Sequence, residues 1–156
     1  MIRLHQLDLE FPEGFSLLSE EEIAQLNINE TGDENFVLRD ENRHMIASLA
    51  YRRVNALFLA VLTLKEIVEK NEKETADLMR SFAYHREGFL ENGEAMGFAY
   101  SYEVQGRRMY GTSFNRKGKK GIYHLHFYMR EEEKEDGSKL VDEIISSMEE
   151  IEGGSV

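Results

Sequence analysis

Residues 98–130 carry the pattern that most constrains this fold. Every second residue at the start of this segment is large and apolar, as in a β-strand with two different faces: Phe98, Tyr100, Tyr102 and Val104. Gln105-Gly106 can close a two-residue hairpin turn, and this turn places Glu103 opposite Arg108 as a pair of opposite charges. We therefore predict a meander of three antiparallel strands.

The second and third strands are expected at residues 107–115 and 122–130, joined by a six-residue loop. Pairing Asn115 with Ile122 across this loop sets Tyr110 opposite Phe127 on one face of the sheet. The other face then carries Tyr100, Tyr102, Met109 and Tyr128. Aromatic side chains on both faces favour helices on both sides of the sheet.

The remaining segments predict further strands and helices around this meander. A first strand runs from Leu4 to Phe11, and a hairpin with a polar tip joins residues 36–38 to residues 45–51. The apolar stretch at residues 56–62 fits either a strand or a helical turn, because it is too short to show a period.

Polar caps and apolar stripes predict three helices. Ser19 and Glu22 form a capping box before a short helix, and Thr63 begins a long amphipathic helix over residues 64–82. Turns are expected at Gly88 and at residues 92–94. Gly137 is expected to break the chain before a last helix that Ser138 caps.

The 156-residue chain carries 19 basic and 30 acidic residues, a formal charge of -11. This length predicts one α+β domain over residues 1–152, followed by a flexible tail at 153–156. The negative surface repels phosphate backbones and anionic lipid, so we expect neither nucleic acid nor a membrane as a partner.

Several chemical classes are excluded by what the sequence lacks. It has no cysteine, which excludes disulfide scaffolds and thiolate chemistry. The N-terminus lacks the apolar run of a signal peptide, and phosphate-binding and nucleophile motifs are absent. We expect a cytoplasmic protein without a cofactor, and we assign no catalytic residue.

The order of the segments is also informative. The opening strand ends in Phe11-Pro-Glu-Gly-Phe15, and the Ser19 helix, the central hairpin, the segment 97–105, the strand 122–130 and a closing helix follow. This order resembles the PsbP-like superfamily, which includes the Ran-binding Mog proteins, photosystem accessory proteins and many bacterial members. The resemblance implies an antiparallel sheet sandwiched by helices and a binding or accessory role. It carries over no functional residue.

The aromatic face of the meander supplies a candidate ligand site. In the predicted register Gly111 lies between Tyr100 and His126, and its missing side chain leaves a dimple. The lining would be Tyr100, Tyr102, His124, His126 and Tyr128. A helix side chain seated over Gly111 is the alternative. His124 and His126 share a face, but no third ligand can be placed, so we assign no metal site.

The loop between the last two strands concentrates positive charge in this acidic chain: Arg116, Lys117, Lys119 and Lys120. It is a candidate partner-binding loop for a phosphate or an acidic partner, and a solvated loop that protects the sheet from aggregation is the alternative.

We therefore expect a small non-enzymatic accessory or binding protein that acts through protein contacts, with a basic partner attracted by its acidic surface. One alternative is a small-ligand-binding protein or enzyme that uses the Tyr and His face, which a deep cavity beside His126 would favour. An inhibitor or immunity-type protein is another.

Overall fold

The computed structural model describes residues 1–26 and 32–151, so the predicted tail at 153–156 lies outside the described residues. The strands are β1 (Ile2–Leu4), β2 (Leu7–Leu9), β3 (Ser16–Leu17), β4 (Glu34–Asp40), β5 (Met45–Arg53), β6 (His85–Asn92), β7 (Ala95–Val104), β8 (Arg107–Lys117), β9 (Gly121–Arg130) and β10 (Glu149–Glu150). The α-helices are α1 (Glu20–Gln25), α2 (Ala56–Val61), α3 (Leu64–Leu78) and α4 (Lys134–Ser146), and short 3-10 helices are η1 (Arg80–Phe82) and η2 (Glu131–Glu133).

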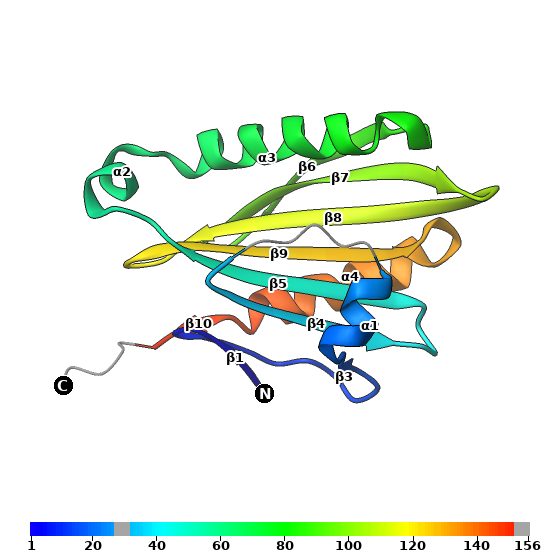
Figure 1. The fold of residues 1–156 in the computed structure, drawn as a ribbon, viewed down its shortest axis with the longest axis horizontal. Helices are drawn as coiled ribbons and strands as arrows, with labels where there is room; N and C mark the ends of the chain where they lie inside the picture. Colours follow the sequence, from blue (N-terminus) through cyan, green and yellow to red (C-terminus); the bar gives the residue numbers. More distant parts are fainter. Residues whose placement is uncertain (27–31, 152–156) are drawn as a thin grey trace.

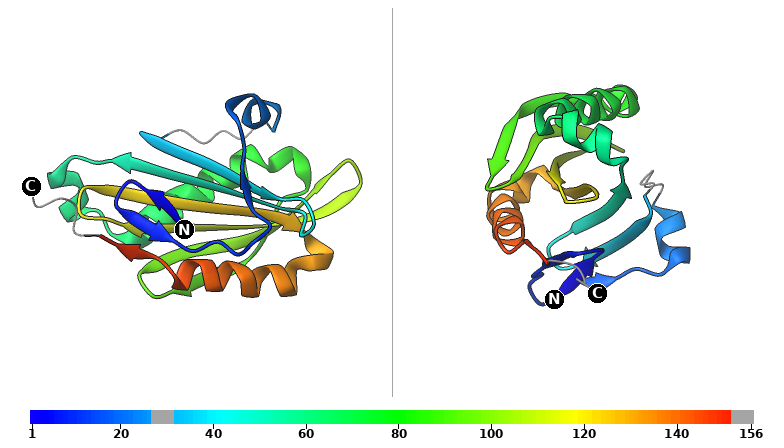
Figure 2. Two further views of the ribbon diagram at one scale, coloured as in Figure 1. Left: turned by 90° about the horizontal axis from the view of Figure 1, so that it is seen from below. Right: turned by 90° about the vertical axis from the view of Figure 1, so that its left-hand side faces the viewer.

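A seven-stranded antiparallel sheet in the order β3-β4-β5-β9-β8-β7-β6 forms the centre of the fold (Figure 1). Helix α3 packs on one face of this sheet, and α4 packs on the other together with the small sheet β1-β2-β10 (Figure 2). The prediction of an α+β fold with an antiparallel sheet between helices is confirmed. Among the described residues, no helix is long and apolar enough to cross a bilayer.

The two faces of the sheet bury different cores. The face toward α4 is aliphatic and aromatic, and its centre combines Leu7, Leu125, Phe127, Val141 and Ile144. The face toward α3 is smaller and mainly aromatic, with Phe98, Tyr100 and Tyr102 against Val68. The predicted stripe of the last helix therefore does pack on the sheet, and the α3 face retains room for polar side chains.

Local capping explains where the helices begin. The Ser19 capping box is present in full, and the Thr63 hydroxyl accepts a hydrogen bond from the backbone N–H of Glu66. The undecided stretch at residues 56–62 is a helix, α2, because the Asn55 side chain accepts from the N–H of Leu57 and caps its first turn.

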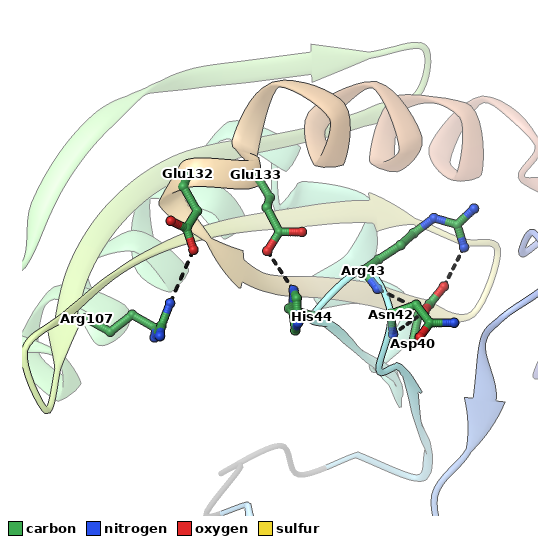
Figure 3. A network of polar contacts seen from close by, with 7 residues as sticks. All are labelled: Asp40, Asn42, Arg43, His44, Arg107, Glu132 and Glu133. Carbon is green, nitrogen blue, oxygen red and sulfur yellow. Dashed lines mark hydrogen bonds and ion pairs between the residues drawn. The ribbon is translucent and has the colours of Figure 1, made fainter.

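A buried carboxylate fixes the polar tip between β4 and β5 (Figure 3). Asp40 accepts hydrogen bonds from the backbone N–H groups of Asn42 and Arg43 and pairs with the Arg43 guanidinium. His44 Nδ1 lies 2.7 Å from Oε1 of Glu133, which ties the tip to the start of α4. Burial acts to raise the pKa of Asp40, but the Arg43 and backbone hydrogen bonds outweigh it and hold that pKa below its usual value.

The hairpin at Gln105-Gly106 and the pairing of Glu103 with Arg108 are confirmed. The register predicted across the next loop is wrong by two residues, since Asn115 pairs with His124 and Lys117 pairs with Ile122. The strands extend further into the loop than predicted, so Tyr110 lies opposite Met129 rather than Phe127. A shift of two residues leaves every side chain on its predicted face.

Three predicted element boundaries are also wrong. The first strand is a hairpin, β1–β2, whose turn contains His5 at a φ of 53° rather than a glycine. Gly88 lies inside edge strand β6 beside a register shift, not at a turn. Gly137 lies inside α4, which begins at Lys134, so Ser138 is not its cap. A Cβ atom at position 137 would lie 2.5 Å from the Met129 sulfur, which explains the glycine there.

Candidate functional site

A groove of about 1130 Å³ lies between α2 and α3 and the sheet face formed by β5, β7, β8 and β9. In Figure 2 this is the face of the sheet over which α3 runs. Tyr102, His124, His126 and Tyr128, four of the five predicted ligand-site residues, line it. The structure therefore brings most of the predicted site to one cavity.

Tyr100 and Gly111 do not form the predicted dimple. Gly111 pairs with Tyr128, not with His126, and the Tyr100 ring itself covers Gly111. A Cβ atom added at Gly111 would lie 2.4 Å from Cζ of Tyr100. Tyr100 is fully buried beneath the groove, and its hydroxyl lies 2.5 Å from Nε2 of His126. The space was filled from the neighbouring strand rather than from a helix.

The imidazole rings that line the groove are held by neighbouring side chains. The Ser113 hydroxyl lies 2.7 Å from Nε2 of His124, and Asn71 of α3 bonds to both groups. His126 stacks on the Tyr128 ring with centroids 4.2 Å apart. These contacts fix the orientation of both rings before anything enters the groove.

The Ser113–His124 contact has the distance of a nucleophile and its base, but the serine is in the wrong place for catalysis. Ser113 is 0% exposed and does not line the groove. The Ser113 hydroxyl also donates to Oδ1 of Asn71, which does line the groove. The contact therefore orients His124 rather than activating Ser113.

Asn115 is the polar residue of this site that sequence reasoning missed. Its side chain lines the groove and is 2% exposed, and its Nδ2 atom has no hydrogen-bond partner among the described residues. The predicted register paired Asn115 with Ile122, so it did not place Asn115 beside His124. The sequence does contain one sign of a polar site on this face: Asn71 and Thr75 are polar residues within the apolar stripe of α3.

Other side chains complete the walls of the groove. Leu78, Phe82 and Val104 form an exposed apolar end, and the burial of Tyr102 raises the pKa of its phenol to about 12, so that group stays neutral. Among the residues that the structure describes, no cluster of three histidine or carboxylate side chains could hold a metal ion.

The predicted basic loop is distributed over two surfaces. Arg116 points away and forms an ion pair with Glu94 at 2.7 Å. Lys117 donates from Nζ to the carbonyl oxygen of Leu62 at 2.6 Å, and the carbonyl oxygen of Lys120 accepts from the N–H of Val54. The loop is thus attached to the chain on both sides of α2.

Helix α2 exposes large apolar side chains beside this loop. Leu57, Phe58 and Val61 are 79%, 66% and 75% exposed, while Leu59 is buried. Two exposed cations lie next to α2. Arg53 precedes the helix in the chain, and the carbonyl oxygen of Lys120 accepts from the N–H of Val54. We call Leu57, Phe58, Val61, Arg53 and Lys120 the α2 surface.

Comparison of the sequence with protein-family models and with curated proteins gives no match. Solved structures do match. The Ran-binding protein Mog1p of Saccharomyces cerevisiae has a TM-score of 0.59 at 9% identity, over 96% of this chain and 94% of its own. LpqN of Mycobacterium tuberculosis, described as involved in cell envelope biogenesis, has a TM-score of 0.51 at 13% identity, over 91% and 81%.

A protein of Bacteroides thetaiotaomicron has a TM-score of 0.60 at 12% identity, over 96% of this chain, which spans about half of that protein's length (47%). These likenesses show that the chain has a Mog1p-like fold, the fold that the resemblance in the sequence implies.

Proposed function

We propose that this chain is a non-enzymatic binding protein and that it contacts a protein partner through the α2 surface. The observation that carries this proposal is the exposure of Leu57, Phe58 and Val61 on one short helix. Water is unfavourable for three such side chains in one place, and contiguous apolar surface on a soluble domain marks an interaction site.

The surroundings of the apolar centre indicate the partner's chemistry. Arg53 and Lys120 border α2, so an apolar patch with acidic residues at its edge would complement this surface. This local preference differs from that of the whole chain, whose charge of -11 attracts basic partners. The local charge governs the docked complex, because screening in salt weakens the more distant charges.

Two further observations support binding rather than catalysis. Ser113, whose hydroxyl lies 2.7 Å from Nε2 of His124, is 0% exposed and does not line the groove. Mog1p, which has the same fold, is a Ran-binding protein, so this fold serves protein binding in at least that case. We also propose the cytoplasm as the compartment, which the cysteine-free sequence fits.

Site-specific photo-crosslinking in the native cell tests the proposal. A photoreactive phenylalanine analogue replaces Leu57, and in a control chain it replaces Phe89, an exposed aromatic residue of strand β6. We expect one discrete crosslinked protein from position 57 that is absent from position 89. Equal crosslinking at both positions, a crosslink to a second copy of this chain, or none at position 57 would overturn the proposal.

A further inference from the structure

The groove beneath α3 has a polar floor and an apolar end, and the protein contact proposed at the α2 surface explains neither. Its floor carries the buried amide of Asn115 and the rings of His124 and His126. One end carries the apolar side chains Leu78 and Phe82. A single occupant would therefore need a polar group over the floor and an apolar body toward that end.

Asn115 identifies the kind of polar group. Its Nδ2 atom donates to no acceptor among the described residues, although the side chain is 2% exposed. A buried amide donor without an acceptor is unfavourable, and a ligand oxygen over the floor would remove that penalty. The occupant therefore presents a hydrogen-bond acceptor.

The charges at the groove suggest that this acceptor is anionic. Arg52 and Lys70 line the groove, and within the described part of the chain neither forms an ion pair. Arg53 lines it too, and Glu66 and Glu74 add two carboxylates, so the lining carries three cations against two anions. A carboxylate can accept from the amide and from a cation together.

The walls are ordered in advance. Ser113 and Asn71 hold His124, and the Tyr100 hydroxyl holds His126, so binding would not have to order these side chains. The volume of about 1130 Å³ lies slightly above the range of roughly 300–1,000 Å³ for small-molecule sites, which suits a long flexible chain.

We propose that this groove binds a long-chain carboxylic acid, with its carboxylate at Asn115 and Arg52 and its apolar chain along Leu78 and Phe82. Arg53 and Phe58 of the α2 surface also line this groove, whereas Leu57 and Val61 do not, so a substitution at Leu57 tests the α2 surface without altering the groove. The proposal adds a small-molecule ligand to a protein that we otherwise propose to bind a protein.

Calorimetric titration of the purified full chain with palmitate tests the site, with hexadecanol and hexadecyltrimethylammonium as probes of the same chain length. We expect one palmitate per chain, at least about ten-fold weaker binding of hexadecanol, and no binding of the cation. No palmitate binding, or equal binding of all three probes, would overturn the proposal.

Variants locate the ligand. Asn115→Leu and Arg52→Gln should each weaken palmitate binding about five- to ten-fold or more, whereas Arg107→Gln, an exposed arginine paired with Glu132, should leave it unchanged. Arg52 is exposed, so its variant keeps the test valid if Asn115→Leu fails to fold. Unchanged affinity in Arg52→Gln and in any folded Asn115→Leu would refute the assignment. Leu57→Ser should bind palmitate normally.

Discussion

The Tyr100 hydroxyl lies 2.5 Å from Nε2 of His126, and the Tyr100 ring reaches it by crossing over Gly111 on the strand between them. This contact links β7 to β9 across β8 and supports the floor of the groove. It requires three things at once: the tyrosine, the histidine and a strand residue without a side chain.

Replacing Gly111 with alanine should destabilise the fold by about 1–3 kcal/mol, because the new Cβ would lie 2.4 Å from Tyr100 Cζ and the buried ring would have to move. Chemical denaturation measures the loss. Gly88→Ala is the matched control in the same sheet, since its Cβ would meet nothing within 4 Å, and it should be neutral or slightly stabilising. Equal effects of the two substitutions would contradict this account.

Tyr100→Phe should lower the free energy of unfolding by about 1–3 kcal/mol, because it removes a hydrogen bond to a buried imidazole. Tyr84→Phe is the comparison: its ring lies 5.5 Å from that of Tyr100, and its buried hydroxyl has no partner among the described residues. Loss of that hydroxyl should be neutral or stabilising. A larger decrease in the free energy of unfolding for Tyr84→Phe than for Tyr100→Phe would show that the Tyr100 hydrogen bond contributes little to stability.

Asp40 should make stability depend on acidity. Its pKa is lowered in the folded chain, so its contribution to stability is present above the usual aspartate pKa of about 3.9 and is lost as the pH falls through the lower folded value. Asp40→Asn should destabilise by about 1.5–3 kcal/mol at pH 7 and flatten the acid side of the stability profile.

Glu41→Gln is the control for Asp40, because Glu41 is exposed at the same tip and its pair with Arg39 lies at the surface. We expect a change within about 0.5 kcal/mol. A profile for Asp40→Asn parallel to that of the unmodified chain below pH 5 would refute the role of Asp40.

Charge at the α2 surface should act on the rate of association. Lys120→Glu reverses an exposed cation beside α2, so it should slow association with an acidic partner and reduce the dependence of that rate on salt. Surface plasmon resonance at two salt concentrations measures both effects. Lys139→Glu, a charge reversal on α4 across the sheet, should have less effect. A faster association of Lys120→Glu would indicate a basic partner instead.

Local chemistry made much of the fold predictable. The turn at Gln105-Gly106 depends on two adjacent residues, and the caps at Ser19 and Thr63 on four, so the sequence predicts them correctly. The β8–β9 register was wrong because the loop permits more than one length of strand, and only packing selects among them. The shift was even, so the predicted faces survived.

The site was less predictable because it depends on distances between separate elements. The depth of the groove follows from how α3 rests on β7 and β8, and the missing partner of Asn115 Nδ2 is a property of that packing. Nothing in the sequence distinguishes Asn115 from a satisfied amide. The exposure of α2 was hidden in the same way, since an apolar run usually indicates burial.

The affinity of the crosslinked partner for variants of the α2 surface is the decisive measurement for the proposed protein contact. The purified partner is titrated with the unmodified chain, with Leu57→Ser and with Phe89→Ser, both substituted residues being exposed. We predict that Leu57→Ser weakens binding at least about ten-fold, equivalent to about 1.4 kcal/mol, while Phe89→Ser leaves the affinity within about two-fold. An unchanged affinity for Leu57→Ser would overturn the proposed contact, as would an equal loss for Phe89→Ser.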